Sequence, residues 1–266
     1  MSKIDSSTVI WLTGASSGIG EALAYELSRT GTRLILSARR LEELERVKSH
    51  CANPDSIMCL PLDLSDNFSL AQKAKEAASF FGKIDILINN GGISQRDRAI
   101  NTSMEVDRRV MEVNYFGSIT LSKALLPDMI KRGGGHHVVI TSAVGIISTP
   151  KRSAYSASKH ALHGFYDALR AEHHDDNIKV SLICPGFIHT NISVNALMGD
   201  GSKQAKMDNA QANGMSAEEC ARQIARAITK DKEEVYIGGL KEVGGIYLKR
   251  FFPGIFSKVV RKMAVT

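Results

Sequence analysis

The stretch that decides the fold is Thr13-Gly14-Ala15-Ser16-Ser17-Gly18-Ile19-Gly20, whose glycines have the spacing GxxxGxG. It follows an apolar run at residues 8–12 and opens a helical pattern at residues 20–29. Glycine lets the backbone turn sharply, and the free N–H groups at a helix N-terminus attract phosphate. A plain strand-to-helix turn is the simpler explanation. The position after the first strand nevertheless favours a dinucleotide site.

Short apolar runs recur along the rest of the chain, at residues 33–37, 57–60, 85–88, 137–141, 178–183 and 234–237. Each run is too short for a helix and nearly continuous in apolar character, as in strands buried on both faces. Helical stretches lie between them, for example at residues 41–49 and 69–80. This alternation predicts an α/β fold: one domain with a doubly wound parallel sheet of seven strands and helices on both faces.

The composition is that of an ordinary globular protein, with 266 residues, 43% hydrophobic and 23% charged. No run of 18 apolar residues occurs, so we expect no transmembrane helix. The beginning, MSKIDSSTVIW, lacks the basic and apolar regions of a secretory signal. The four cysteines form no CxxC pair. We therefore expect neither a disulfide framework nor a structural zinc site, and a cytoplasmic location.

The end of the second strand bears on cofactor choice. A site selective for NAD places an acid there to bind the ribose 2′-hydroxyl. This chain has Ser37-Ala38-Arg39-Arg40, without an acid. Guanidinium groups match a 2′-phosphate, so the segment predicts NADP, with Arg39 as the main contact and Ser37 as a helper. Two solvated arginines at the start of the next helix are the alternative.

A candidate catalytic pair lies in Tyr155-Ser156-Ala157-Ser158-Lys159, on a helical pattern over residues 153–170. A spacing of four residues places Tyr155 and Lys159 on one helix face. A nearby ammonium stabilises tyrosinate and can lower the phenol pKa toward the range of an acid–base catalyst. Taken alone, an incidental Tyr and Lys would be the simpler explanation.

Further motifs accompany this pair: Asn89-Asn90-Gly91-Gly92, Asn114, Ser142 and Pro185-Gly186. In order and spacing, the set resembles the classical short-chain dehydrogenase/reductase family over residues 8–240. The resemblance implies a Rossmann-type fold and an oxidoreductase that uses a nicotinamide cofactor. The basic tail and the Ser37-Ala38-Arg39-Arg40 segment show a looser similarity to the dehydrogenase/reductase member 7-like branch of that family.

The resemblance also implies roles for the catalytic positions. Tyr155 would donate the proton to a carbonyl during reduction, or accept it during oxidation. Lys159 would bind the nicotinamide ribose and tune Tyr155. Ser142 would hydrogen-bond the substrate oxygen, and Asn114 would hold the water that links Lys159 to solvent.

Cofactor contacts follow in the same way. Asp63 would contact the adenine, Asn90 and Gly92 would line the cofactor, and PGFIHT at residues 185–190 would grip the carboxamide. The expected NADP(H)-binding positions are Gly14, Ser16, Ser17, Gly18, Ile19, Gly20, Ser37, Arg39, Arg40, Asp63, Leu64, Asn90, Gly92, Tyr155, Lys159, Pro185, Gly186, Ile188 and Thr190.

The function predicted from this set is an NADP(H)-dependent carbonyl reductase of an apolar substrate, with hydride transfer between nicotinamide and a carbonyl or secondary alcohol and with no metal. A non-catalytic NADP-binding regulator is one alternative, and the intact set Ser142, Tyr155, Lys159 and Asn114 argues against it. A membrane-surface enzyme for lipid-like substrates is another. We expect a homodimer or homotetramer, formed through the helices that follow Asn114 and contain Tyr155.

A basic amphipathic extension at residues 241–266 follows the domain predicted for residues 1–240. It holds six Lys and Arg residues and one acid, so most of the net charge of +6 lies there. The rest of the chain has no basic stripe for nucleic acid.

Apolar residues recur at helical steps in this extension, at Leu248, Phe251, Phe252, Ile255, Phe256, Val259, Val260 and Met263. Pro253-Gly254 predicts a break into two short helices. We expect this stripe to pack on the same domain, with Phe251 and Phe252 beside the substrate pocket. A weak peripheral membrane contact through residues 246–263 is the alternative.

Overall fold

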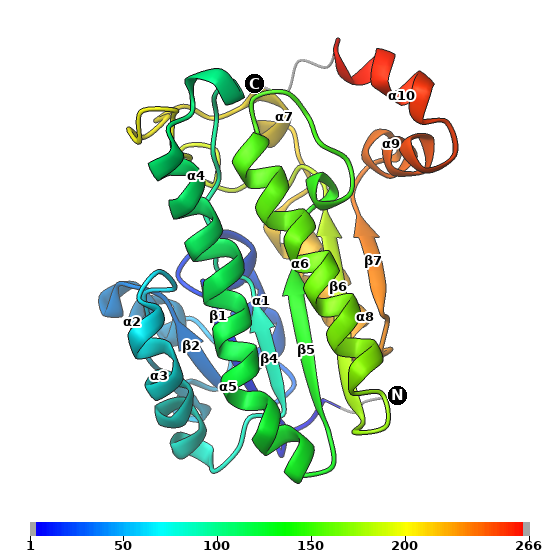
Figure 1. Cartoon of the computed structure of the whole chain (residues 1–266). Helices are drawn as coiled ribbons and strands as arrows, with labels where there is room; N and C mark the ends of the chain where they lie inside the picture. Colours follow the sequence, from blue (N-terminus) through cyan, green and yellow to red (C-terminus); the bar gives the residue numbers. More distant parts are fainter. Residues whose placement is uncertain (1–3, 263–266) are drawn as a thin grey trace.

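A parallel sheet of seven strands forms the centre of the computed structural model, which describes residues 4–262 (Figure 1). The strand order is β3-β2-β1-β4-β5-β6-β7, and every neighbouring pair is parallel. The predicted fold class is therefore confirmed. The strands are β1 (Val9–Thr13), β2 (Arg33–Ser37), β3 (Ile57–Cys59), β4 (Ile86–Asn89), β5 (Gly135–Ile140), β6 (Ile178–Pro185) and β7 (Glu234–Ile237).

Helices cover both faces of the sheet, and Figure 1 shows α3, α5 and α6 on the near face. They are α1 (Gly18–Ser28), α2 (Leu41–Ser49), α3 (Asn67–Phe81), α4 (Met104–Met111), α5 (Gly117–Lys131), α6 (Ser153–Glu172), α7 (Asn209–Ala212), α8 (Ala217–Thr229), α9 (Leu240–Phe251) and α10 (Pro253–Val260). Four short helical turns complete the chain: η1 (Pro54–Ser56), η2 (Ala99–Asn101), η3 (Glu112–Phe116) and η4 (Ala143–Gly145).

Strand β1 shows why the sheet forms, because all five of its residues are buried. Ile10 and Leu12 pack in one core cluster with side chains of α1 and α8. Val9 and Trp11 pack on the opposite face with side chains of α3 and α5. Side chains alternate along a strand, so a run that is apolar throughout needs a helical layer on each face. Burying each large side chain stabilises the fold by about 1.5–3 kcal/mol.

The 186–216 segment connects β6 to α8 and contains only the short helix α7. Backbone hydrogen bonds nevertheless fix it to the chain after β4. Arg96 N donates to Leu197 O at 2.8 Å, and Leu197 N donates to Ser94 O at 2.8 Å. The segment is therefore ordered against the carboxyl end of the sheet, where a site is expected.

The C-terminal extension forms two helices that meet at Pro253, as the Pro253-Gly254 pair predicts. Ile246 of α9 and Phe256 of α10 are buried against Ala143 and Ile147. Part of the predicted apolar stripe therefore packs on the chain. The division at residue 240 remains a prediction, and Met263 lies outside the described residues.

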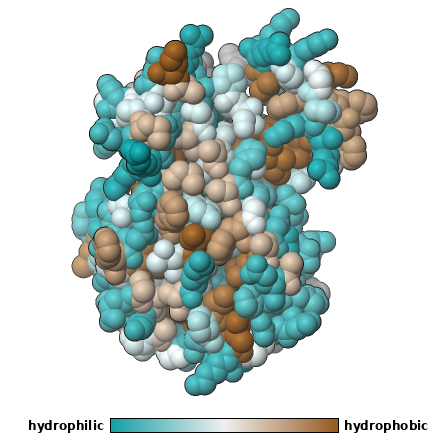
Figure 2. Space-filling view, in the orientation of Figure 1, coloured by the Kyte–Doolittle hydropathy of each residue, from teal (hydrophilic) through white to brown (hydrophobic). Residues whose placement is uncertain are grey.

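Phe251 and Phe252 do not close the pocket, contrary to our expectation. Phe251 is 67% and Phe252 is 59% exposed, and Ile255 and Val259 are also exposed. Figure 2 shows apolar and hydrophilic residues side by side on this part of the surface, at the upper right. Among residues 4–262, no helix combines the length and apolar character needed to cross a membrane.

Replacing Phe256 by alanine tests how much this packing contributes. The substitution leaves a cavity beside Ala143 and Ile147, so we expect the free energy of unfolding to fall by about 2–4 kcal/mol. Phe252→Ala is the matched control, because it removes the same atoms from an exposed position and should cost less than about 0.5 kcal/mol. Urea denaturation measures both. Equal losses would contradict the assigned packing.

Candidate active site

The site lies at the carboxyl end of the sheet, beside β1, which has β2 on one side and β4 on the other. Successive crossovers run in opposite directions from such a point, so a crevice opens between them. A cavity of about 890 Å³ occupies this edge. It reaches from the glycine turn, past α6, to the 186–216 segment.

The glycine turn needs its glycines for conformation and for space. Gly14 and Gly18 have φ angles of +64° and +58°, a region that L side chains rarely adopt. A Cβ on Gly14 would lie 2.7 Å from Gly91 Cα, and a Cβ on Gly20 would lie 2.1 Å from Gly14 O. Gly20 is thus required for the close approach of α1 to the turn. The turn and the first N–H groups of α1 fit a bound phosphate.

Asn90 fastens this turn to the end of β4. Its Nδ2 donates to Thr13 O at 3.0 Å and to Gly14 O at 3.1 Å. The backbone N atoms of Asn90 and Gly91 each donate to Thr13 Oγ1 at 3.1 Å. Asn90 therefore holds the shape of the turn as well as lining the cavity.

The end of β2 presents Arg39 and Arg40 to solvent at the cavity edge. Both are exposed cations, which suits contact with an anion at this edge. Ser37 also lines the cavity, but it is fully buried and its Oγ accepts a hydrogen bond from Trp11 Nε1 at 2.8 Å. Ser37 is therefore a weaker candidate for a phosphate contact than the sequence suggested.

Asp63 follows β3 and lines the same end of the cavity. Burial raises the pKa of its carboxyl. Hydrogen bonds from Ser65 and the charges of Arg109 and Arg39 outweigh this effect and hold the pKa below its ordinary value. Asp63 is therefore ionised at neutral pH and accepts hydrogen bonds, as a contact with an adenine amino group requires.

Tyr155 lies in the first turn of α6 and is 8% exposed. Burial raises the pKa of its phenol, while the charges of Arg96 and Arg152 and a hydrogen bond with Ser142 lower it. The net direction is upward, whereas the sequence suggested a lowered pKa. Ser142 caps η4, and its Oγ also donates to Pro185 O at 3.3 Å.

Lys159 lies one helical turn further along α6, with its Nζ 5.8 Å from the centre of the Tyr155 ring. Nζ donates to Ile140 O at 2.8 Å. Burial lowers the pKa of this ammonium to about 8. Lys159 therefore remains largely protonated at neutral pH and is one of the cations that line the cavity.

Asn114 belongs to the π-helical turn η3 and is fully buried. Its side chain exchanges two hydrogen bonds with the backbone of Ile93, at 2.8 and 2.9 Å, and donates to Ser158 Oγ at 2.9 Å. It does not line the cavity. Asn114 thus connects the chain after β4 to α6 from behind the site.

The structure brings almost all predicted site residues to one cavity. Those that line it are Gly14, Ser16, Ser17, Gly18, Ile19, Ser37, Arg39, Arg40, Asp63, Leu64, Asn90, Gly92, Ser142, Tyr155, Lys159, Pro185, Gly186, Ile188 and Thr190. Gly20 and Asn114 are the exceptions, since both support the site without facing it.

Sequence reasoning missed three charged residues at this site. Arg96 and Arg152 line the cavity, and both pair with Asp208. Asp208 is 112 positions from Arg96 and 56 from Arg152, so no local pattern connects them. Only the folded chain shows that they meet.

A possible metal-binding group among the described residues consists of His163, Cys184 and Glu234. His163 Nε2 lies 3.1 Å from Thr141 Oγ1, and His163 Nδ1 lies 3.9 Å from a Glu234 oxygen. Cys184 approaches Nε2 whereas Glu234 approaches Nδ1. One ligand atom from each of the three residues lies within 4.8 Å of the others, but His163 is already engaged by Thr141, so we assign no metal to this group.

Fold and cavity together define a nucleotide-binding α/β protein with a tyrosine–lysine centre. Comparison with known proteins is consistent with this class, because the family described as short chain dehydrogenase matches residues 8–199. The chain belongs to the short-chain dehydrogenase/reductase family of oxidoreductases. It is 46% identical over 262 residues to a dehydrogenase/reductase SDR family protein 7-like of Anopheles gambiae, covering 96% of this chain and 83% of that protein.

Solved structures show the same fold. A short-chain dehydrogenase from Streptomyces avermitilis has a TM-score of 0.80 at 30% identity, over 97% of this chain and 99% of that one. An alcohol dehydrogenase from Thermococcus sibiricus, complexed with 5-hydroxy-NADP, has a TM-score of 0.73 at 28% identity, over 87% and 96%. A family member from Burkholderia phymatum in complex with NAD has a TM-score of 0.82 at 22% identity, over 100% and 98%, and shows the fold alone.

Proposed function

We propose that the protein is an NADPH-dependent carbonyl reductase that acts on an apolar small molecule. The observation that carries this proposal is the position of Ser142, Tyr155 and Lys159 on one cavity with the glycine turn and Arg39. A bound nicotinamide would exchange a hydride with the carbonyl carbon. The glycine turn and the start of α1, which line the same cavity, fit the phosphates of such a dinucleotide.

The residues of the chain then orient the substrate and move the proton. Ser142 and Tyr155 hydroxyls donate to the carbonyl oxygen, where negative charge develops. Tyr155 gives its proton to that oxygen, and the raised pKa keeps the phenol protonated at neutral pH. Lys159 would hold the ribose hydroxyls of the cofactor, and its charge would stabilise the tyrosinate that forms. Asn114 fixes the Ile93 backbone, and through Ser158 it also supports α6.

Replacing Tyr155 by phenylalanine tests this mechanism. The ring remains but the transferable proton is lost, so turnover should fall by a factor on the order of 10² or more. Binding of NADPH, followed by fluorescence, should survive. Tyr247→Phe is the matched control, because Tyr247 is half exposed on α9 and should keep full activity. Nearly unchanged reduction of a confirmed carbonyl substrate by the Tyr155 variant would contradict the role.

The preference for NADPH over NADH is part of the proposal. It is supported by Arg39 and Arg40, which lie at the cavity edge. It is also supported by Ala38, because an acid at that position would repel a 2′-phosphate. The NADP analogue in the Thermococcus sibiricus enzyme and the NAD in the Burkholderia phymatum protein show that both cofactors occur on this fold.

The double variant Ala38→Asp, Arg39→Ser tests cofactor choice. It removes a cation and adds an acid beside the phosphate, so the ratio of kcat/KM for NADPH to that for NADH should fall by about 10- to 100-fold. Arg33→Ser is the control, since Arg33 is exposed at the other end of β2. Equal use of both cofactors by the unmodified protein would overturn the assignment.

We further propose a homodimer or homotetramer formed through α5 and α6. Helix α6 has small, exposed residues that would let a second helix approach closely: Ala157, Gly164 and Ala168. Ala154 does not belong to this surface, because it is buried against Val106 and Val110. Light scattering at micromolar concentration should show an oligomer, and a monomer would contradict the proposal.

A second candidate function is that of a cytoplasmic enzyme which works at a membrane surface on lipid-like substrates. Phe251 and Phe252, exposed at the junction of α9 and α10, are close in sequence to the exposed cations Arg250 and Lys258, as expected of a weak contact with anionic lipid. The unpaired state of all four cysteines is consistent with a reducing compartment.

Vesicle sedimentation tests this second candidate. The protein should sediment with vesicles that contain phosphatidylserine and not with vesicles of phosphatidylcholine alone, and binding should weaken as salt rises. The Phe251→Ser, Phe252→Ser double variant should lose this binding without a change in melting temperature. No sedimentation of the unmodified protein at low salt would rule the contact out.

A further inference from the structure

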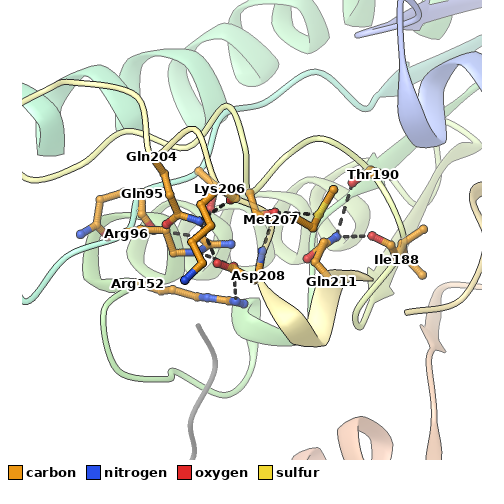
Figure 3. Close-up of polar contacts among 12 residues, drawn as sticks. Gln95, Arg96, Arg152, Ile188, Thr190, Gln204, Lys206, Met207, Asp208 and Gln211 are labelled. Atoms are coloured by element: carbon orange, nitrogen blue, oxygen red, sulfur yellow. Dashed lines mark hydrogen bonds and ion pairs between the residues drawn. The ribbon is translucent and has the colours of Figure 1, made fainter. Parts of the chain in front are cut away.

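Three charged side chains from separate parts of the chain meet beside the catalytic helix (Figure 3). Arg96 follows β4, Arg152 precedes α6, and Asp208 belongs to the 186–216 segment. Arg96 Nε lies 2.8 Å and Arg152 Nη2 lies 3.3 Å from Asp208 Oδ2. All three side chains are at most 5% exposed. Buried charges cost free energy unless they are paired, so this cluster calls for an explanation.

Asp208 organises the segment around it. Gln204 Nε2 donates to Asp208 Oδ1 at 2.8 Å, and the backbone N of Asp208 donates to Ser193 Oγ at 3.3 Å. Its carbonyl oxygen accepts from the backbone N atoms of Gln211 and Ala212, the last two residues of α7. Both carboxylate oxygens and both backbone polar groups of Asp208 are therefore engaged, and Figure 3 shows these contacts converging on it.

The two arginines connect this segment to the catalytic elements on both sides. Arg96 Nη1 donates to Ser94 Oγ at 2.5 Å and to Gln95 O at 2.8 Å. The Arg152 guanidinium stacks over the Phe187 ring at 5.4 Å, near the start of the segment. Arg152 is also three residues before Tyr155. A change at Asp208 is thus transmitted to the chain that carries Tyr155.

Tyr155 lines the cavity together with Arg96, which follows β4, and with Arg152, the N-cap residue of α6. Arg96 and Arg152 both lower the pKa of the phenol, against the larger opposing effect of burial. Lys159 is the cation on the same helix, with Nζ 5.8 Å from the ring centre. Burial and the neighbouring Arg96 lower the pKa of Arg152 to about 10, so this guanidinium is charged at neutral pH. Asp208 is the acid bound to both arginines.

We propose that Asp208 is a positioning residue for Tyr155: it holds Arg96 and Arg152 beside the phenol and offsets part of their positive charge. The proposal rests on the proposed function, because it assigns importance to the proton of Tyr155. The charges of Arg96 and Asp208 then have opposite effects on how easily the Tyr155 phenol loses its proton. Removing the carboxylate charge makes tyrosinate easier to form, and removing the Arg96 charge makes it harder.

The backbone near Asp208 supports a positioning role. Ala205 has a φ of +53°, a left-handed conformation that costs free energy for alanine. Gln204 Nε2 spans this residue, since it donates both to Lys206 O at 2.7 Å and to Asp208 Oδ1. Ala205 N also donates to Val194 O at 3.0 Å. The contacts of Asp208 thus help to maintain a strained turn in the segment that walls the cavity.

The test compares Asp208→Asn with Arg96→Gln in the full-length protein, using tyrosine labelled with ¹³C at Cζ. The resonance that is lost in Tyr155→Phe belongs to Tyr155, so its titration can be followed without turnover. Asp208→Asn keeps a side-chain oxygen for Arg96 and Arg152 but removes the negative charge, so it should lower the titration midpoint by about half a unit or more. Arg96→Gln removes a positive charge and should raise the midpoint by a similar amount. The pH midpoint of alcohol oxidation should move in the same two directions.

Controls separate this effect from a loss of structure. Asp208→Glu keeps the charge and should return the midpoint toward that of the unmodified protein. Asp128→Asn removes an exposed acid of α5 that pairs with Arg132 and does not line the cavity, and it should leave the midpoint in place. A purely structural role would change KM and melting temperature in both main variants but would leave the midpoint unmoved. If one main variant does not fold, the sign of the shift in the other decides.

An unmoved midpoint, or shifts of the same sign in Asp208→Asn and Arg96→Gln, would overturn the proposal. Failure of the proposed function gives a different result: Tyr155→Phe would keep its activity, while the resonance of Tyr155 would still report whether Asp208 and Arg96 control its proton.

Discussion

The hydrogen bonds that join the end of β1 to the end of β4 are the constraint on which the site depends. Thr13 Oγ1 accepts from the backbone of Asn90 and Gly91, and the Asn90 amide donates back to Thr13 and Gly14. β1 lies between β2 and β4 in the sheet, so these bonds fix the glycine turn at the point where the crossovers diverge. The cofactor cradle and the chain that leads to Arg96 both start from this junction.

The fold could be read from the sequence because its signals are local. A strand buried on both faces is apolar throughout, and the glycine turn marks the first crossover. The ends of strands were less certain, since they depend on neighbouring strands: β6 continues to Pro185 because it pairs with Ile237 of β7. The exposed face of the C-terminal helices could not be predicted, because it is decided by packing on η4 about a hundred residues earlier.

The candidate site was predictable where residues are close in sequence. Tyr155 and Lys159 occupy one helix, and their spacing alone places them together. Arg96, Arg152 and Asp208 each resemble ordinary surface charges in the sequence, since charged residues are seldom buried. Their separation of up to 112 positions leaves no periodic signal. Sequence also could not show that Gly20 and Asn114 face away from the cavity, because both belong to the same motifs as residues that line it.

Burial and charge act against each other at Tyr155, and their balance bears on the direction of the proposed reaction. Burial raises the pKa of the phenol and therefore favours the protonated form, which a proton donor in carbonyl reduction must have. The cost appears when the proton leaves, since tyrosinate would be a buried anion. Arg96, Arg152 and Lys159 offset that cost, and each is held by a separate contact, with Asp208 or with Ile140 O. The same arrangement that keeps the acid protonated at rest thus stabilises the charge that its reaction creates.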